Sequence, residues 1–369
     1  MEPAGARSLC LPRSRSSSPR RARAAWRGRS FGPPGPERGG PRGPYAALDL
    51  GTNNCRLLVA RPTADGFRVV DAFSRIVRLG EGLSQTGRLS EAAIARTLEA
   101  LRICRDKMAA RGVARARLIA TEACRAAENG AEFLAEVRES LGMVLEVVDR
   151  ETEARLAVAG CGDLADRDAE AILLFDIGGG SSEIIWLDRS RRDLSPVGRI
   201  EAWESLRIGV VSLAETFGGG DVTPEIFTAM ARCVGEALTP FVQRVAGRRR
   251  CGRFHLLGTS GTVTTIAGVH LDLARYDRRA VDGLWLTSAE VDAAVARLKG
   301  MSYAERAANG CIGVERADLV LAGCAILEAI RGHFPAERLR IADRGLREGI
   351  LTQMMRADRV GPHARGAGA

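Results

Sequence analysis

The chain of 369 residues is 46% hydrophobic and 27% charged, which is ordinary for a globular protein and suggests about two domains. Its net charge of +9 is concentrated in residues 1–44, which contain ten Arg and only two acidic residues. The rest of the chain is nearly neutral, which excludes a general nucleic-acid-binding surface. The nine Cys include no Cys-x-x-Cys pair, the four His include no pair four residues apart, and no apolar run approaches the ~18 residues of a membrane span. These absences argue against a disulfide framework, a histidine-based metal site and a transmembrane helix.

Residues 1–44 also hold eight of the 14 Pro and seven Gly, and we expect them to form a disordered tail. A first lobe is predicted over 45–165. Strands are expected at 45–50, 55–61 and 67–79, followed by a helix at 90–110 with Ser90 as its N-cap. Strands and helices then alternate at 118–121, 132–141, 144–148 and 151–160.

A second lobe is predicted over 166–344, where the same order of elements begins again. Strands at 171–176, 182–187 and 200–210 precede a helix at 224–245, with Thr223 as its cap and Pro224 at its first position. A strand at 254–257, helices at 288–298 and 316–333, and a strand at 339–342 follow. A final helix at 345–356 could pack back on the first lobe, and 357–369 is expected to be a frayed end.

An internal repeat relates the two predicted lobes. Asp49-Leu-Gly-Thr-Asn-Asn-Cys-Arg-Leu-Leu-Val-Ala aligns without gaps on Asp176-Ile-Gly-Gly-Gly-Ser-Ser-Glu-Ile-Ile-Trp-Leu, 127 residues later. Each copy is an apolar strand ending in Asp-x-Gly, a turn of small polar residues, and a second apolar strand. Two equivalent lobes placed face to face would bring the two turns together across a cleft.

The second turn has the chemistry of a metal–phosphate site. Asp176 can hold Mg²⁺, often through water. Glycines let the backbone approach an anion closely with several N–H groups, and serine adds a hydroxyl; the residues concerned are Gly178, Gly179, Gly180 and Ser181. A glycine-rich hairpin with an Asp cap is the alternative interpretation.

The first turn would supply matching groups from the other lobe. Asp49 would be a second carboxylate, and Thr52, Asn53 and Asn54 would form a second cradle. A third loop of small residues follows the strand at 254–257 and could place backbone donors at a helix start; its candidate residues are Gly258, Ser260, Gly261 and Thr262. A plain tight turn is almost as good an interpretation of that loop.

A hydrolase also needs a group that orients and deprotonates water beside the phosphate. Glu151 and Glu153 stand at a strand-to-helix junction, where spacing alone favours an electrostatic role at the helix N-terminus. Arg125 and Asn129, four residues apart, would by themselves be an ordinary solvated helix face.

Several blocks in order resemble the exopolyphosphatase/guanosine pentaphosphate phosphohydrolase family of the actin-like ATPase superfamily. They are Asp49-Leu-Gly-Thr-Asn-Asn-Cys-Arg-Leu, Thr121-Glu-Ala-Cys-Arg-Ala-Ala-Glu-Asn, Glu153-Ala-Arg-Leu and Asp176-Ile-Gly-Gly-Gly-Ser-Ser-Glu, with support from Gly258-Thr-Ser-Gly-Thr, Arg316-Ala-Asp and Asp343-Arg-Gly-Leu-Arg-Glu-Gly. The resemblance spans residues 45–355. It implies an α/β fold with two RNase H-like lobes, each a mixed five-stranded sheet flanked by helices, with a cleft between them.

The resemblance also implies roles for individual residues. Glu153 matches the family's catalytic base, which aligns water for attack on the terminal phosphate, and this replaces the capping interpretation. Asp176 and Glu183 match carboxylates that serve metal and water, and with Asp49 they are the expected ligands of Mg²⁺ or another divalent cation such as Mn²⁺. Arg125 matches an arginine that contacts substrate phosphate.

The sequence departs from the family pattern at three points. Thr52 and Asn54 replace two Ser of the first loop, and both keep a hydrogen-bond donor. Glu122 stands where a small residue is common and adds a negative charge near the polyanion path. Larger members carry a further C-terminal helical region that helps to hold long polyphosphate, and the resemblance therefore leaves chain-length preference and processivity open here.

The leading hypothesis is a cytoplasmic exopolyphosphatase, which releases terminal orthophosphate from inorganic polyphosphate. Conversion of guanosine pentaphosphate to tetraphosphate, as in the stringent response, is the alternative within the family, and a silent nucleotide or polyphosphate sensor is a further one. A kinase of the same superfamily would need a sugar or acid pocket and an adenosine site, for which no clear signal is present. No specific nucleic acid or membrane partner is expected, whereas a homodimer is possible.

Overall fold

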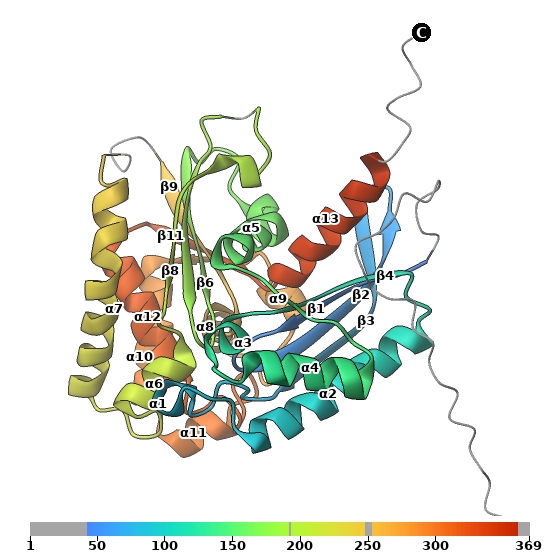
Figure 1. Ribbon diagram of the computed structural model, residues 1–369. Helices are drawn as coiled ribbons and strands as arrows, with labels where there is room; N and C mark the ends of the chain where they lie inside the picture. The colour runs from blue at the N-terminus through green and yellow to red at the C-terminus, as the bar shows by residue number, and fades with distance from the viewer. Residues whose placement is uncertain (1–42, 192, 248–252, 361–369) are drawn as a thin grey trace, which may run out of the picture. The chain divides into compact units, whose positions relative to one another are not determined.

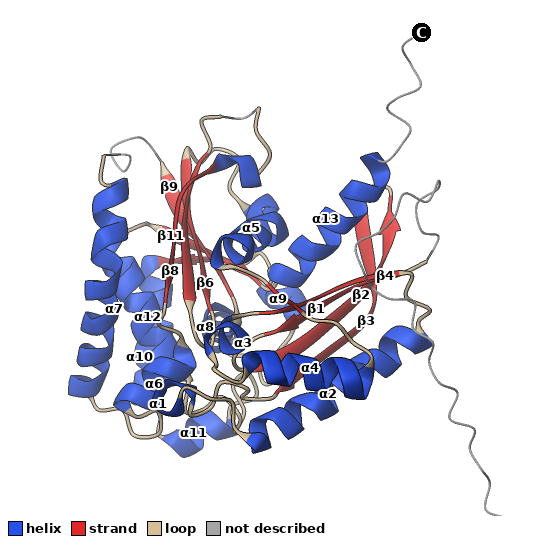
Figure 2. Ribbon diagram, in the orientation of Figure 1, coloured by secondary structure: helices blue, strands red, loops and turns tan. Residues whose placement is uncertain are grey.

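The structure is a computed structural model that describes residues 43–191, 193–247 and 253–360. The described residues form two mixed sheets with strand orders β3-β2-β1-β4-β5 and β10-β11-β9-β6-β7-β8 (Figure 1). Helices flank both sheets (Figure 2). The expectations for the N-terminal tail lie almost wholly outside the described residues, and so do those for 361–369.

The first sheet has an antiparallel half and a parallel half. Its strands are β1 (Tyr45–Leu50), β2 (Asn54–Thr63), β3 (Gly66–Ile76), β4 (Arg115–Ala120) and β5 (Glu146–Val147). Pairs β1–β2 and β2–β3 are antiparallel, whereas β4 runs parallel to β1 and β5. The central strand β1 is buried along its length except at Asp49, which places that carboxylate at the edge where the site is built.

The helices of this half include α1 (Leu83–Thr86), α2 (Glu91–Ala110), α3 (Glu122–Ala126) and α4 (Gly130–Leu141). Ser90 caps α2 as predicted, since its hydroxyl accepts from Ala93 N at 3.2 Å. The prediction that Arg125 and Asn129 share one helix face is wrong. Helix α3 ends at Ala126, and the buried Asn129 amide instead bonds the backbone of Leu89 in both directions.

The second sheet has six strands rather than the five predicted. They are β6 (Ala171–Ile177), β7 (Ser182–Asp188), β8 (Ile200–Leu206), β9 (Phe254–Thr259), β10 (Trp285–Thr287) and β11 (Arg338–Ala342). The missed strand, β10, has three residues and pairs antiparallel with β11. A run this short carries no detectable alternation, and its last residue, Thr287, already caps the next helix.

The helices of this half are α6 (Val210–Phe217), α7 (Pro224–Val245), α8 (Gly261–His270), α9 (Arg278–Val281), α10 (Ser288–Gly300), α11 (Tyr303–Ala308) and α12 (Val320–His333), with 3₁₀ turns at Gly162–Leu164 and Val197–Arg199. Thr223 caps α7 and Pro224 opens it, as predicted. Helix α12 starts four residues later than predicted.

The predicted strand at 200–210 ends at Leu206, because the chain must turn at Gly209 to pack against Gly179. A Cβ at Gly209 would lie 2.3 Å from the Gly179 carbonyl carbon and oxygen.

The last helix, α13 (Leu346–Val360), packs against α5 (Arg150–Cys161) and against β1 and β2 (Figure 1). Gly349 allows this close crossing, since a Cβ there would lie 2.1 Å from the Leu156 carbonyl oxygen. Ile350 and Leu351 are buried in a cluster with Tyr45. In the described part of the chain, no helix has both the length and the apolar character needed to cross a membrane.

Candidate active site

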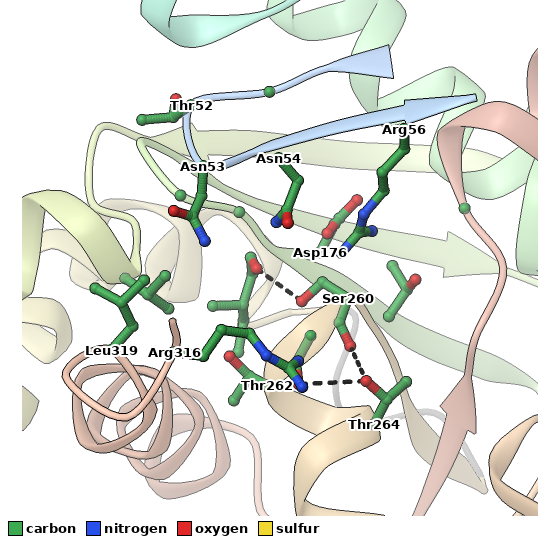
Figure 3. Close-up of a pocket in the computed structure, with 18 of the residues that line it drawn as sticks. Thr52, Asn53, Asn54, Arg56, Asp176, Ser260, Thr262, Thr264, Arg316 and Leu319 are labelled. Carbon is green, nitrogen blue, oxygen red and sulfur yellow. Dashed lines mark hydrogen bonds between the residues drawn. The ribbon is translucent and has the colours of Figure 1, made fainter. Parts of the chain in front are cut away.

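A cavity of about 980 Å³ is lined by the ends of strands from both sheets (Figure 3). The two copies of the internal repeat form two hairpins, β1–β2 and β6–β7, whose turns border this cavity. We call residues 51–54 the first hairpin loop and residues 178–181 the second. The predicted meeting of the two turns is therefore found in the structure.

The two hairpins have the same register. Asp49 pairs with Arg56 across the first hairpin, and Asp176 pairs with Glu183 across the second. In each loop a backbone N–H closes the turn at 2.9 Å, from Gly51 to the Asn54 oxygen and from Gly178 to the Ser181 oxygen. The repeat in the sequence therefore corresponds to a repeat in backbone geometry.

The loops contact each other through the glycines of the second one. A Cβ at Gly179 would lie 3.0 Å from Thr52 Cβ and 3.1 Å from Asn53 N, and a Cβ at Gly180 would lie 2.7 Å from Thr52 Oγ1. No side chain larger than hydrogen fits without moving the first loop. The glycines thus serve close approach between the loops as well as access to a ligand.

Each loop also offers backbone donors. Within the described part of the chain, the amide N–H groups of Thr52, Asn53, Gly179 and Gly180 donate no hydrogen bond. Successive free N–H groups in a turn form a cradle for an anion. Asn53 and Asn54 extend into the same cavity (Figure 3).

The third predicted loop reaches the cavity only in part. Ser260, Gly261 and Thr262 line it, and the Ser260 hydroxyl donates to the Ile177 oxygen at 2.7 Å, which ties this loop to the second hairpin. Ser260 has a positive φ of 91°, an uncommon conformation for a residue with a side chain. Gly258 does not line the cavity, because it lies in β9 against the Phe175 ring.

Glu153 enters the cavity from the first turn of α5. The helix N-cap is Asp149, whose carboxylate accepts from Thr152 N at 2.7 Å, so Glu153 is not needed for capping. Its side chain is only 6% exposed, and its Oε2 accepts from Arg125 Nη2 at 2.7 Å. Burial, reinforced by the negative charge of Glu183, raises the pKa of Glu153 to about 9.

Six more carboxylates border the cavity, and three of them, Asp49, Asp176 and Glu183, are the predicted metal ligands. Burial, with help from Glu183 and Asp49, raises the pKa of Asp176 to about 7. Burial also raises the pKa values of Asp49 and Glu183. Glu183 Oε1 accepts from the hydroxyls of Ser181 and Ser205, both at 2.9 Å, which fixes its orientation.

Arg125 lies behind these carboxylates and does not line the cavity. Its guanidinium donates to Glu153, to Glu122 and to the Val148 oxygen. Glu122 also accepts from Arg150 Nη2 at 2.9 and 3.0 Å. The extra negative charge of Glu122 is therefore balanced by two arginines, which the sequence pattern did not indicate.

Six arginines on the cavity wall were missed as site residues: Arg56, Arg75, Arg278, Arg316, Arg344 and Arg347. Arg56 extends from β2 toward Asp176, and Arg316 enters from the opposite wall (Figure 3). Arg316 and Arg347 belong to the blocks Arg316-Ala-Asp and Asp343-Arg-Gly-Leu-Arg-Glu-Gly, so the signal was in the sequence. Arg56 could have been found from the repeat, where it aligns on Glu183.

Carboxylate oxygens around the cavity are suitable ligands for a divalent cation. Among the described residues, no three His, Cys, Asp or Glu side chains converge into a ready-made cation site. Mg²⁺ is commonly held by one or two carboxylates, by water and by substrate phosphate oxygens, and the oxygen donors Asp49, Asp176 and Glu183 around one cavity suit that mode. Asn53 Oδ1 adds a buried oxygen with no hydrogen-bond partner.

Comparisons with known proteins agree with this geometry. The model of the Ppx/GppA phosphatase family matches residues 58–358. Exopolyphosphatase 2 of Mycobacterium tuberculosis is 32% identical over 325 residues, which cover 84% of this chain and 98% of that protein.

Solved structures show the same fold. The crystal structure of the Aquifex aeolicus member of the Ppx/GppA family covers 85% of this chain and 98% of its own, with a TM-score of 0.69 and 28% identity. An exopolyphosphatase from Cytophaga hutchinsonii has a TM-score of 0.76 at 23% identity, over 85% and 98% of the two chains. The predicted fold class of two RNase H-like, actin-like lobes is confirmed, apart from the sixth strand.

Proposed function

Since the chain belongs to the Ppx/GppA phosphatase family and is an exopolyphosphatase-type hydrolase, we propose that it releases terminal orthophosphate from inorganic polyphosphate with Glu153 as base. One observation carries this proposal: a buried carboxylate faces the same cavity as two loops with free backbone donors. The loops would hold the terminal phosphoryl group, and Glu153 would act on the water beside it.

The proton of the attacking water would go to Glu153 Oε1. Glu153 Oε2 is engaged by Arg125, which leaves Oε1 to accept a proton from water as the water oxygen bonds to the terminal phosphorus. The bond from that phosphorus to its bridging oxygen breaks, and the shortened chain leaves with the bridging oxygen. Arg125 keeps the carboxylate oriented, so it acts through Glu153 in this arrangement rather than on phosphate.

The remaining groups would bind and orient. The free N–H groups of both hairpin loops donate to phosphate oxygens, and Arg56 and Arg316 neutralise charge on the next phosphates. Asp49, Asp176 and Glu183 would hold Mg²⁺ or Mn²⁺, which when bound offsets negative charge on the reacting phosphate. A cytoplasmic location and a homodimer remain predictions.

The test is phosphate release from short polyphosphate, long polyphosphate, guanosine pentaphosphate and ATP, each with Mg²⁺. Glu153→Gln should lower kcat by about 10²–10⁴ with little change in substrate affinity. Glu151→Gln is the matched control, since Glu151 lies in the same helical turn but is half exposed and pairs with Arg155. Turnover by Glu153→Gln close to the native rate would exclude Glu153 as base.

One observation favours guanosine pentaphosphate as a second candidate substrate. Part of the cavity wall is apolar, formed by Ile266, Ile312, Leu319 and Val320, with the Tyr276 ring nearby. An inorganic chain has no apolar group to place there, whereas a purine ring has. Release from guanosine pentaphosphate alone would assign the protein to alarmone hydrolysis, and tight binding without release would favour the sensor.

A further inference from the structure

The segment 77–84, which we call the strap, runs from the end of β3 into the first residues of α1 and lies against the first hairpin loop. The N–H groups of Val77 and Arg78 both donate to the Asn53 oxygen, at 2.9 and 3.0 Å, and Gly80 N donates to the Thr52 oxygen at 2.9 Å. The strap therefore fixes the backbone of two residues that border the cavity.

The same strap is bonded to the half of the molecule that carries the second sheet. Arg78 makes a two-pronged ion pair with Asp318, Nη1 to Oδ2 at 2.9 Å and Nη2 to Oδ1 at 2.8 Å, and Nη2 also donates to the Glu315 oxygen at 2.9 Å. These two acceptors flank Arg316 in the chain. Arg78 thus links the first hairpin loop, through its backbone N–H, to the segment that carries a cavity arginine, through its guanidinium.

A second attachment lies further along the strap. The Glu215 carboxylate on α6 accepts from Gly82 N at 2.7 Å and from the Ser84 hydroxyl. Helix α6 is itself bonded to the second hairpin loop, because Val210 N and Val211 N donate to the carbonyl oxygens at positions 178 and 179. The strap is therefore connected by hydrogen bonds to both hairpin loops.

The backbone of Arg78 is held in an uncommon conformation. Its φ is +46°, in the left-handed region that residues with a side chain rarely adopt. Such conformations persist where surrounding contacts enforce them, and they cluster at functional sites. The side chains of Arg78 and Asp318 are only 28% and 27% exposed, unlike the fully solvated pairs that contribute little.

We propose that Arg78 is a positioning residue for hydrolysis, which acts through Asp318 to fix the first hairpin loop relative to Arg316 and the second loop. This inference rests on the proposed function. The groups of the reaction are divided between the two halves: Glu153 and Asp49 stand beside the first hairpin, whereas Asp176 and Glu183 belong to the second. Attack by water requires these groups in one arrangement, and a displacement of about 1 Å can cost about 10²-fold in rate.

The experiment compares Arg78→Ala, Asp318→Asn, and the charge-exchanged double variant Arg78→Asp with Asp318→Arg. Asp tolerates a positive φ better than most residues, so the exchange adds no backbone penalty at position 78. Arg117→Ala is the control, because Arg117 makes a similar two-pronged pair with Glu146 at 2.9 Å, and neither Glu146 nor its other partner, Gln353, lines the cavity. Each variant is assayed for kcat and KM on polyphosphate.

A second measurement needs no activity. Hydrogen–deuterium exchange reports the N–H groups of Val77, Arg78, Gly80 and Gly82, which the strap uses for bonding. Arg78→Ala and Asp318→Asn should exchange these N–H groups at least about tenfold faster, whereas Arg117→Ala should leave them unchanged. Thermal unfolding checks that every variant is folded.

We expect the two single variants to lose about 10²-fold in kcat with KM changed less than about threefold, and the exchanged pair to recover at least about tenfold of that loss. An exchanged pair no better than either single variant, or strap N–H groups still protected in Arg78→Ala, would overturn the proposal. If the native protein releases no phosphate from any substrate, the proposed function fails, and hydrogen exchange alone decides whether Arg78 holds the strap.

Discussion

The two hairpins β1–β2 and β6–β7 share a register but not a chemistry. In both, an Asp at the end of the first strand faces the residue seven positions later. That residue is Arg56 in the first hairpin and Glu183 in the second. The same backbone geometry thus places an arginine beside the Asp in the first hairpin and a second carboxylate beside the Asp in the second.

The loops differ in the same sense. The first presents the side chains of Thr52, Asn53 and Asn54, whereas three of the four residues of the second are glycines, of which Gly179 and Gly180 pack directly against the first loop. We infer a division of labour, in which the first hairpin contributes mainly to binding phosphate, and the second contributes two of the three carboxylates that would hold the metal. The predictions below test this division from the largest expected effect to the smallest.

Substitutions of the residue seven positions after each Asp should distinguish the two hairpins most clearly. Glu183→Gln should lower kcat by about 10³-fold, because a carboxylate held by two hydroxyls beside the reacting phosphate is lost. Arg56→Gln should raise KM about tenfold with a smaller change in kcat, since one charge-assisted contact is lost. Steady-state kinetics on short polyphosphate checks both; equal effects on kcat would contradict the division.

The two aspartates should also differ. Asp176→Asn should lower kcat/KM by about 10²-fold and raise the Mg²⁺ concentration for half-maximal rate, because its partner across the strand is another carboxylate. Asp49→Asn should lower kcat/KM only about tenfold, since its partner across the strand is Arg56 rather than a second carboxylate. A metal titration of each variant provides the measurement, and a larger defect in Asp49→Asn would reverse the assignment.

The rate should increase with pH because both key pKa values are raised. Asp176, with a pKa of about 7, and Glu153, with a pKa of about 9, act as carboxylates, so activity is lost as the pH falls through these values. Between pH 9 and pH 7, kcat/KM should fall about tenfold per unit as Glu153 takes up a proton, and below pH 7 about 10²-fold per unit because Asp176 is protonated as well. The profile of Asp176→Asn should lack the step near 7, and an unchanged profile would count against Asp176.

The smallest effect concerns the contact between loops. Gly180→Ala would place a Cβ 2.7 Å from Thr52 Oγ1 and should lower kcat/KM about tenfold by moving the loops apart. Gly51→Ala in the first hairpin should cost less than about threefold, because its Cβ would lie 3.6 Å from the nearest atom, the Asn54 oxygen. Equal effects would show that the glycine of the second loop is not needed for close approach.

Local patterns predicted much of the fold. The alternation of strands and helices, the caps Ser90 and Thr223, and the meeting of the two Asp-x-Gly turns are all present in the structure. The errors occur where the signal was short or non-local. Strand β10 has three residues, and β8 ends early because Gly209 must approach Gly179, which lies thirty residues earlier in the chain.

The sequence by itself determined which residues were candidates for phosphate chemistry. Each copy of the repeat and each motif block is a short run of consecutive residues, which can be recognised without knowing what packs against it. Only the tertiary structure decided how they are used. It placed Arg125 behind Glu153, removed Gly258 from the cavity, balanced Glu122 with Arg150, and joined Arg78 to Asp318. Each of these outcomes depends on the packing of segments that are far apart in the chain. The periodicity of a sequence predicts helices and strands, but it does not predict which distant side chains will meet.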